Sequence, residues 1–458
     1  MAEKRIIKWW NGRKNRQFSA TQLIAISFAV IILVGTLLLA LPAASRSGES
    51  CGFLPALFTA TSATCVTGLT LFDTWSQWSG FGQIVLLILF ELGGLGFMSM
   101  ASLVIFLLRQ KVGLKQRMVM AQALSMSDMG GIVRLQKLVL VGSLLIQLTG
   151  AVILLIRFWP EHGFWQAFKW GVFHSVAAYC NSGFDIFGCL EPGSSLTLFY
   201  NDPVVLLTIS AMIILGGLGF FVWQEVFELR RWKKFSVYTK LVLLTTAVLL
   251  VGGTALTCLL EWNNPATLGS MTVPEKLLGG FFQAVTTRTA GFFAMDQGGM
   301  TDGGKMVSIA LMLIGGSSGS TAGGIKTVTF VVLLLFLLSR MRSRSSVTVF
   351  KRTIPGQQIL DAVTVICIVV GLALVGAVFV CSTCDVSFLD ALYETASAIA
   401  TVGLTAGATG KLTVAGQILI IIYMYFGRVG VLTLSLGFLM GDRAEERFRY
   451  ADTNLLIG

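Results

Sequence analysis

The stretch Phe58-Thr-Ala-Thr-Ser-Ala-Thr-Cys-Val-Thr-Gly68 decides the fold, because the same eleven-residue frame occurs four times in the chain. Each copy opens on an aromatic residue and closes on a glycine, and the copies align without a gap. They occupy residues 58–68, 173–183, 281–291 and 393–403, at intervals of about 110 residues. This period is too long for a solenoid of short repeats. The sequence therefore predicts four large structural repeats.

Each frame lies between two long apolar segments, and the composition is that of a membrane protein. The chain is 55% hydrophobic and 12% charged, whereas soluble globular chains contain about 25% charged residues. A helix needs about 20 apolar residues to cross the hydrocarbon core. We expect first spanning helices at residues 22–41, 135–157, 241–260 and 359–380. Second spanning helices are expected at residues 81–108, 204–226, 307–338 and 418–440.

Positive charge gathers in five blocks, which hold 25 of the 34 lysine and arginine residues: 1–20, 109–137, 230–240, 340–352 and 443–449. These blocks flank the apolar segments, and the positive-inside rule places them in the cytoplasm. Such a placement argues against nucleic-acid binding. The same basic residues are also suited to contact with anionic membrane lipid.

Both ends of every unit then lie on the cytoplasmic side, so the units are parallel repeats around an axis along the membrane normal. The chain is expected to be a multi-pass protein of the cytoplasmic membrane with both termini in the cytoplasm. The predicted division is a basic N-terminus at 1–20, pore repeats at 21–109, 134–229, 238–339 and 357–441, and a tail at 442–458.

The ends of the frames are typical of a cation filter. The small and polar residues of each frame suit a short helix that enters the membrane without crossing it, and such backbone must line a protein-walled cavity. The fourth frame ends in a Thr-Val-Gly segment, which is how a potassium selectivity filter begins, and such filters bind the ion through rings of backbone carbonyls. The expected filter residues are Val66, Thr67, Gly68, Asn181, Ser182, Gly183, Thr289, Ala290, Gly291, Thr401, Val402 and Gly403.

The predicted fold is therefore an all-α membrane protein with eight spanning helices and four pore helices around one pseudo-fourfold pore. Each repeat runs helix, pore helix, filter, helix. The carbonyl ends of the pore helices carry partial negative charge, which favours a cation at the centre. Because the four triplets differ, we expect looser discrimination among potassium, rubidium and sodium than a strict channel shows.

A glycine cluster recurs in the second helices, at residues 93–96, 216–219, 315–319 and 427–430. In the third repeat it extends over ten residues with five glycines, and each glycine costs a helix about 1 kcal/mol relative to alanine. That helix is predicted to break at membrane depth, just below the filter. The expected gate comprises Gly315, Gly316, Ser317, Ser318, Gly319, Ser320, Thr321, Ala322, Gly323, Gly324 and Arg428.

Arg428 stands in the column of Gly94, Gly217 and Gly316, and an arginine near mid-membrane is costly and usually functional. It is expected to bind the free carbonyls of the broken segment; a static structural contact is the alternative. Arg288 is expected to bind carbonyls or acid groups behind the filter, with Glu394 as a candidate partner. For Lys326 we favour a side chain that reaches the membrane interface over one that neutralises helix-end carbonyls.

The four frames, the stretch Thr287-Arg-Thr-Ala-Gly-Phe292 and the serine–glycine segment resemble the bacterial Trk/Ktr potassium-uptake family over nearly the whole chain. The first spanning helix begins near residue 20, so the Ktr-type translocating subunit is the most similar kind. The resemblance implies potassium uptake, often stimulated by sodium, by a homodimer that binds a cytosolic nucleotide-binding regulatory subunit, a KtrA-like ring. Potassium would be the substrate, and no organic cofactor is expected in this chain.

Catalysis is not expected. The serines of the third glycine cluster lack a general base, because His162 and His174 fall on the outer side. Residues 319–327 nearly match a P-loop, but Ile325 separates the glycine from the lysine. Two modes of transport stay open: a gated channel, or a symporter coupled to sodium or protons through Glu91 or Glu394. The pairing of Cys51 with Cys189 in the outer loops also stays open.

Overall fold

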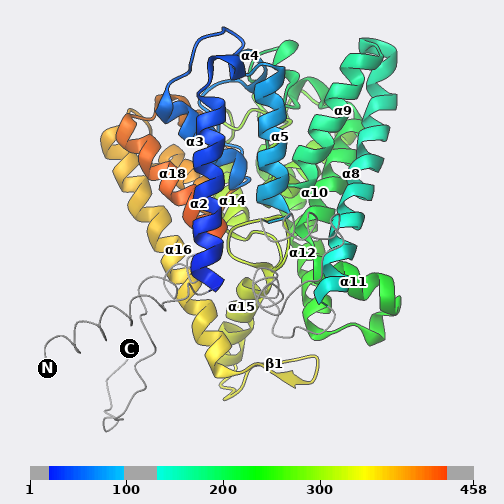
Figure 1. Cartoon of the computed structure of the whole chain (residues 1–458). Coiled ribbons are helices and arrows are strands. Elements are labelled where there is room, and N and C mark those ends of the chain that lie inside the picture. The colour runs from blue at the N-terminus through cyan, green and yellow to red at the C-terminus, as the bar shows by residue number, and fades with distance from the viewer. Residues whose placement is uncertain (1–19, 97–131, 431–458) are drawn as a thin grey trace, which may run out of the picture.

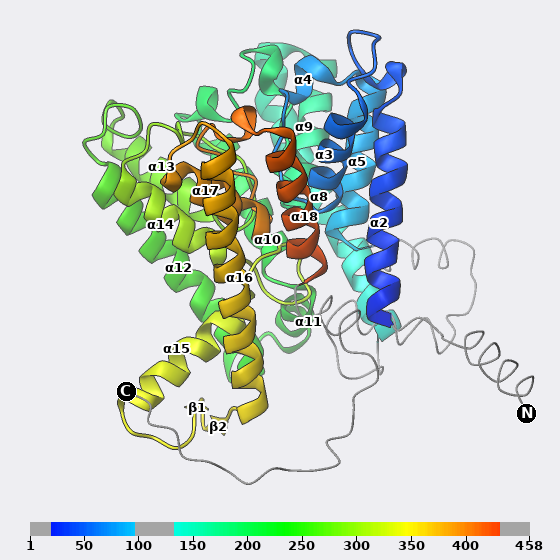
Figure 2. The ribbon, with the colours of Figure 1, turned by 90° about the vertical axis from the view of Figure 1, so that its left-hand side faces the viewer.

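The computed structural model describes residues 20–96 and 132–430 of the chain. Within them, each repeat begins with a long apolar helix: α2 (Ala20–Leu39), α8 (Ile132–His162), α12 (Val237–Glu261) and α16 (Gly356–Thr383). All four are long and apolar enough to span a membrane. In Figures 1 and 2, α2 and α16 both start at the lower end of the molecule, as parallel repeats require. The predicted N-terminus and C-terminal tail lie outside the described residues.

A shorter helix follows each long one and runs back into the molecule: α3 (Phe53–Thr64), α9 (Phe164–Tyr179), α13 (Val273–Thr286) and α17 (Phe388–Ile399). Every frame forms the end of one of these helices and the turn behind it. They pack against the first helix of their own repeat, and their last turns are buried on all sides. These are the four pore helices that the frames predict.

The second helices are α5 (Gly80–Gly94), α10 (Pro203–Gly217), α14 (Asp302–Leu313) and α18 (Val414–Val429). Each starts at a residue whose side chain accepts a hydrogen bond from an amide of the first turn: Ser79, Asp202, Thr301 and Thr413. Such N-caps satisfy donors that a helix start leaves free. The caps therefore set where the chain turns back toward the lower end.

The glycine clusters end these helices, and this corrects the prediction of continuous second helices: α5 ends at Gly94 within the expected 81–108 and α18 at Val429 within the expected 418–440, whose remaining residues, 97–108 and 431–440, lie outside the described ones. Residues 204–226 were expected to form one continuous helix, but α10 ends at Gly217 and α11 (Phe220–Leu229) leaves at an angle of 95°. Gly219, between them, has a φ of 93°, which a glycine adopts without strain. In the third repeat, α14 and α15 (Thr327–Met341) are separated by residues 314–326, which we call the repeat-3 loop.

The remaining elements are small. Strands β1 (Thr348–Val349) and β2 (Arg352–Thr353) pair antiparallel in a hairpin at the lower end. Short helical turns are α4 (Thr74–Gln77), η1 (Pro42–Ala44), η2 (Phe187–Cys189), η3 (Thr197–Phe199), η4 (Trp232–Lys234) and η5 (Thr409–Lys411). The predicted all-α class with four helix–pore-helix–helix repeats is confirmed.

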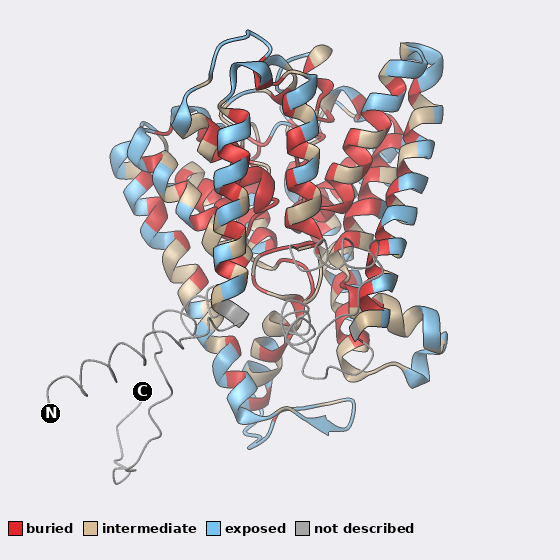
Figure 3. Cartoon of the chain, in the orientation of Figure 1, coloured by how far each residue is buried: buried red, intermediate tan, exposed pale blue. Residues whose placement is uncertain are grey.

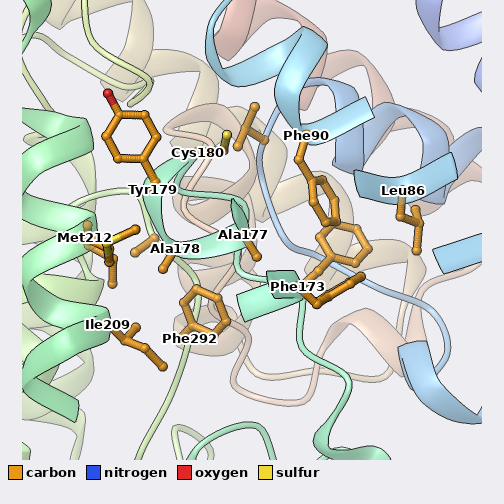
Figure 4. Packing of buried hydrophobic residues seen from close by; sticks show 14 of the residues in the cluster. Leu86, Phe90, Phe173, Ala177, Ala178, Tyr179, Cys180, Ile209, Met212 and Phe292 are labelled. Atoms are coloured by element: carbon orange, nitrogen blue, oxygen red, sulfur yellow. The ribbon is translucent and has the colours of Figure 1, made fainter. Parts of the chain in front are cut away.

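Burial follows the arrangement expected in a bilayer. Buried residues fill the centre of the molecule, while the outer faces of the helices are exposed (Figure 3). Large apolar side chains lie on those faces, for example Leu148 at 62% and Val251 at 72% exposure. Figure 4 shows Phe90 of the first repeat beside Phe173 of α9 in the second, with their ring centres 5.8 Å apart. This packing buries the end of the pore helix α9.

Candidate functional site

Each pore helix ends in the same backbone turn. The first residue of every triplet has a left-handed φ: 56° at Val66, 61° at Asn181, 70° at Thr289 and 52° at Thr401. In repeats 1, 2 and 4 the amide of the next residue then bonds a carbonyl five residues back, as at Thr67 to Ser62, over 2.8 Å. This is the Schellman pattern that ends many helices, usually with a glycine in the left-handed position.

Left-handed backbone at a residue with a side chain costs about 1–3 kcal/mol and persists only where the surroundings enforce it. A β-branched residue such as Val66 is an especially rare occupant. The frames indicated the turn through their closing glycines, but this second left-handed residue was not foreseen. It stands two places before the closing glycine in all four copies.

The four closing glycines form a ring. A methyl group placed on Gly68 would lie 2.6 Å from the carbonyl oxygen of Ser182, and one on Gly183 would lie 2.7 Å from that of Ala290. A methyl group on Gly291 would lie 2.6 Å from the carbonyl oxygen of Val402. One on Gly403 would overlap the carbonyl oxygen of Thr67, which closes the cycle. The glycine of each repeat therefore faces the middle carbonyl of the next repeat, in the order 1, 2, 3, 4 and back to 1.

Such a ring suits a cation. The four middle carbonyls come from Thr67, Ser182, Ala290 and Val402, whose side chains differ while their backbone groups occupy equivalent positions. A backbone ring tolerates this variation, because carbonyl oxygens replace the water around the ion. In repeats 1 and 4 a serine hydroxyl also accepts the amide of the closing glycine over 3.0 Å, from Ser62 and Ser397 respectively. The filter residues are thus brought together at one point.

The repeat-3 loop lies at the centre of the molecule, on the side of the ring that faces α11 and α15 (Figure 1). It bonds mainly to the second repeat. The amides of Ser317 and Thr321 donate to the carbonyls of Gly217 and Gly216, and the Thr321 hydroxyl donates to the carbonyl of Tyr179. A methyl group on Gly323 would overlap the Thr401 hydroxyl. The loop is therefore packed directly against Thr401 of the predicted filter.

Arg428 joins this loop to two other repeats. Its guanidinium donates to the carbonyls of Thr321 in the loop and Gly93 in the first repeat, and to that of Gly94 over 3.0 Å. Five donors make arginine suited to several carbonyls at once. The side chain places positive charge beside the loop below the ring.

The expectation that Arg288 binds a carbonyl is confirmed, while its pairing with Glu394 and the interface position of Lys326 were wrong. Arg288 donates to the Gly315 carbonyl at 3.3 Å and to the Thr327 hydroxyl at 3.2 Å, while Glu394 is bonded by Thr405 and Thr409 of its own repeat. Glu394 is therefore not the partner of Arg288, because hydroxyls of its own outer segment already satisfy its oxygens. Lys326 was expected at the membrane interface, but its ammonium donates to the carbonyl of Ala322 in the repeat-3 loop at 2.8 Å.

The remaining candidate residues have varied surroundings. Glu91 keeps one buried carboxylate oxygen without a hydrogen-bond partner. His174 bonds the carbonyl of Trp170 and the amide of Ile186 through its two ring nitrogens, which leaves neither nitrogen for chemistry.

The outer cysteines Cys51 and Cys189 are free thiols. Burial raises the pKa of both thiols, so they stay protonated and weakly reactive near neutral pH. Groups of three or more potential metal-ligating side chains are absent from the described residues.

Comparison with known proteins gives consistent results. The TrkH family model, described as a cation transport protein, matches residues 6–447. The chain is 39% identical to the potassium/sodium uptake protein NtpJ of Enterococcus hirae, over 97% of this chain and 99% of that protein. It is 38% identical to the Ktr system potassium uptake protein B of Bacillus subtilis, over 100% of both chains.

Among solved structures, the potassium transporter TrkH from Vibrio parahaemolyticus matches with a TM-score of 0.69 at 18% identity. The match covers 94% of this chain and 86% of that one. At this identity the likeness shows a shared fold.

Proposed function

Because the chain belongs to the TrkH family of cation transport proteins, we propose that it takes up potassium across the cell membrane through the ring of four filter triplets. The chain is a multi-pass protein of that membrane. The proposal includes the division into pore repeats at 21–109, 134–229, 238–339 and 357–441, with both termini in the cytoplasm.

The observation that supports it most is the closed cycle of glycines and carbonyls. Each of the four glycines faces the middle carbonyl of the next repeat, so the four triplets surround one axis. The carbonyl ends of the four pore helices lie directly behind them. Both features stabilise a cation that has lost its hydration water, and neither would favour an anion.

The repeat-3 loop, from Gly315 to Gly324, together with Arg428, is proposed as the gate. The loop packs under the filter, contacts Thr401 and Tyr179, and takes a bond from an arginine whose charge repels a passing cation. Most of its bonds use backbone carbonyls and amides, which water can satisfy when the loop moves aside.

A test of the gate uses Arg428→Ala combined with deletion of residues 317–322. The change removes both the charge and the obstruction, so potassium flux should rise. Arg46→Ala, at an exposed arginine of the outer loop before α3, is the matched control and should leave flux unchanged. Unchanged flux in the folded double variant would refute the gate.

A coupled symporter is the second candidate. Glu91 favours it, because a buried carboxylate with one unpartnered oxygen lies two residues from the carbonyl that Arg428 binds. The protein reconstituted in liposomes separates the two modes when potassium flux is measured against imposed sodium and proton gradients. Flux that follows only the potassium gradient supports a channel; flux driven uphill by either other gradient supports coupling. No potassium flux under any gradient would refute the proposed function.

Assembly is part of the proposal. We propose that this chain works as a homodimer with a separate cytosolic regulatory ring, as the family resemblance implies; two relatives are named as proteins of a Ktr system. The lower loops, which carry the basic residues Arg340 to Arg352, are the proposed contact surface. Co-purification with such a ring, lost on charge reversal in this loop, would test it.

A further inference from the structure

A groove runs along the outer face between α8, α10 and α11, and we propose that it binds an anionic phospholipid of the cytoplasmic leaflet. The phosphate group would lie at Arg134 and Lys137, and one acyl chain would follow the groove toward the middle of the membrane. The binding stands independently of the transport mechanism. Its effect on flux rests on the function proposed above.

Three adjoining cavities make up the groove. The lowest, of about 410 Å³, and the middle one, of about 160 Å³, share Leu138 and Phe227 in their walls. The middle one shares Leu145 and Ile146 with the uppermost, of about 430 Å³. A cavity near 150 Å³ with apolar walls binds a molecule of benzene size. The middle cavity alone therefore accommodates several methylene groups.

The lowest cavity is the only charged part of the groove. Its walls include Arg134, Lys137 and Glu228, a net charge of one positive unit. Arg134 pairs with Glu228 at 3.4 Å but is 82% exposed, and exposed pairs of this kind contribute little stability. Its guanidinium is free to turn to a phosphate. Exposed basic residues also follow α11 directly, from Arg230 to Lys234. Basic pockets between spanning helices on the cytoplasmic side are typical lipid head-group sites.

The dimensions agree with one leaflet. From Arg134 to Leu145 the α8 helix rises about 16 Å, at about 1.5 Å per residue. Half of a hydrocarbon core about 30 Å thick is about 15 Å. A chain anchored at Arg134 therefore reaches the middle cavity within its own leaflet. The stacked rings of Trp223 and Phe227, with centres 5.5 Å apart, form one wall near the charged end.

The middle cavity also adjoins the elements that hold the repeat-3 loop. Tyr179 lines the cavity, and its backbone carbonyl accepts the hydroxyl of Thr321 from that loop. Phe220 lines it too, and its amide donates to the carbonyl of Gly319 at 2.8 Å. An acyl chain in this cavity would support both anchors from the membrane side. Bound lipid should therefore alter how readily the loop moves.

The test uses two matched glycine variants. Gly142 lines the middle cavity, and a methyl group placed on it meets nothing within 4 Å, so the β-carbon of Gly142→Leu fits and the larger side chain should occupy part of the cavity. Gly252 on α12 has the same open surroundings and lines none of the three cavities. Gly252→Leu therefore controls for the added leucine. Native mass spectrometry counts the phosphatidylglycerol or phosphatidylcholine that each variant retains.

The wild type should retain phosphatidylglycerol in preference to phosphatidylcholine. Exclusion of two methylene groups weakens binding by about tenfold, so Gly142→Leu should lose phosphatidylglycerol to that degree while Gly252→Leu binds as the wild type does. Arg134→Gln with Lys137→Gln should remove the preference between head groups. Equal retention by all variants, or no preference in the wild type, would overturn the proposal. So would a Gly142→Leu protein that changes its oligomeric state at constant lipid per chain, because a second copy would then cover the groove.

Potassium flux into liposomes with and without phosphatidylglycerol completes the test. The lipid should change wild-type and Gly252→Leu flux and leave Gly142→Leu flux unchanged. Lipid loss without any difference in flux would overturn the link to the loop. Absence of flux in every variant would refute the transport function, while the mass spectra would still decide the binding.

Discussion

Substitution of one filter glycine tests the ring directly, and the chain supplies a matched control four residues away. Gly403 and Gly407 both have a φ of 92°. An alanine at either position should cost about 1–3 kcal/mol in backbone strain. The two sites differ in their surroundings: a methyl group on Gly407 meets nothing within 4 Å, while one on Gly403 overlaps the Thr67 carbonyl and lies 2.8 Å from the Gly68 α-carbon.

The overlap at Gly403 sets the size of the expected effect. Carbon atoms pack best at about 3.5–4.0 Å, so the first and fourth repeats must separate by at least about 0.7 Å to admit the methyl group. Overpacking of this kind costs roughly a further 1–3 kcal/mol. The same displacement widens the carbonyl ring, so Gly403→Ala should lose most potassium uptake and admit sodium more readily. Gly407→Ala should transport as the wild type does.

Three measurements separate strain from ring geometry. Thermal unfolding of both purified variants gives the stability loss. Growth of an uptake-deficient strain at low potassium gives function in cells, and liposome flux with potassium, rubidium and sodium gives selectivity. Equal transport by the two folded variants would refute the argument that the glycines form a ring, whatever their stabilities.

Other contacts predict further outcomes. Ser397→Ala removes the hydroxyl that accepts the amide of its filter glycine, so it should cost about 1 kcal/mol and raise sodium flux; unchanged selectivity would contradict this. Lys305 and Asp390 join the third and fourth repeats at 2.7 Å, so a double-mutant cycle of Lys305→Met and Asp390→Asn in thermal unfolding should give a coupling of about 1.5–3 kcal/mol, and additive losses would rule the link out. Burial, and then the charge of Asp73, raises the pKa of Asp185 in the outer segment to about 7. The stability that its protonated carboxyl supports is complete below about pH 4 and is lost as pH rises through 7; Asp185→Asn should unfold at a midpoint that falls less than that of the wild type between pH 5 and 8, and parallel curves would contradict this.

Much of the architecture could be predicted because it depends on patterns along the chain. Apolar length determines which segments span, and the basic blocks give a common orientation. The closing glycines mark backbone turns that other residues disfavour. Gly68 and its three counterparts do take left-handed conformations and do meet. These features recur at equivalent positions in the four repeats, so each repeat supports the prediction made from the others.

The bend in the second repeat was missed because its cause lies partly outside that repeat. Gly219 permits the turn. The amide of Phe220, the first residue of α11, then donates a hydrogen bond to the carbonyl of Gly319 in the repeat-3 loop. The partner is a hundred residues away in sequence. The available signal was the glycine at the fourth position of the cluster, where Gly96 and Gly430 are left-handed as well.

Partners of buried charges could not be read from the sequence for a related reason. Arg288 and Glu394 appeared complementary, yet a carboxylate can be satisfied by hydroxyls from its own outer segment. Thr405 and Thr409 bond Glu394 at 2.7 and 2.5 Å. Arg288 binds the carbonyl of Gly315, which is the other kind of partner that was expected for it. Which partner each charged group binds depends on distances of a few ångströms between helices. The spacing of residues along the chain does not determine those distances.

The repeat-3 loop belongs to one quarter of a pore whose filter draws on all four. An assembly of four identical subunits has four equivalent obstructions, and it can pass through states in which only some have withdrawn. The gate proposed here is one segment, held by bonds to Gly216, Tyr179 and Arg428. Electrical recordings from a single chain should therefore show two current levels without intermediate steps, and two such pores in a dimer should open independently of each other unless their regulator couples them.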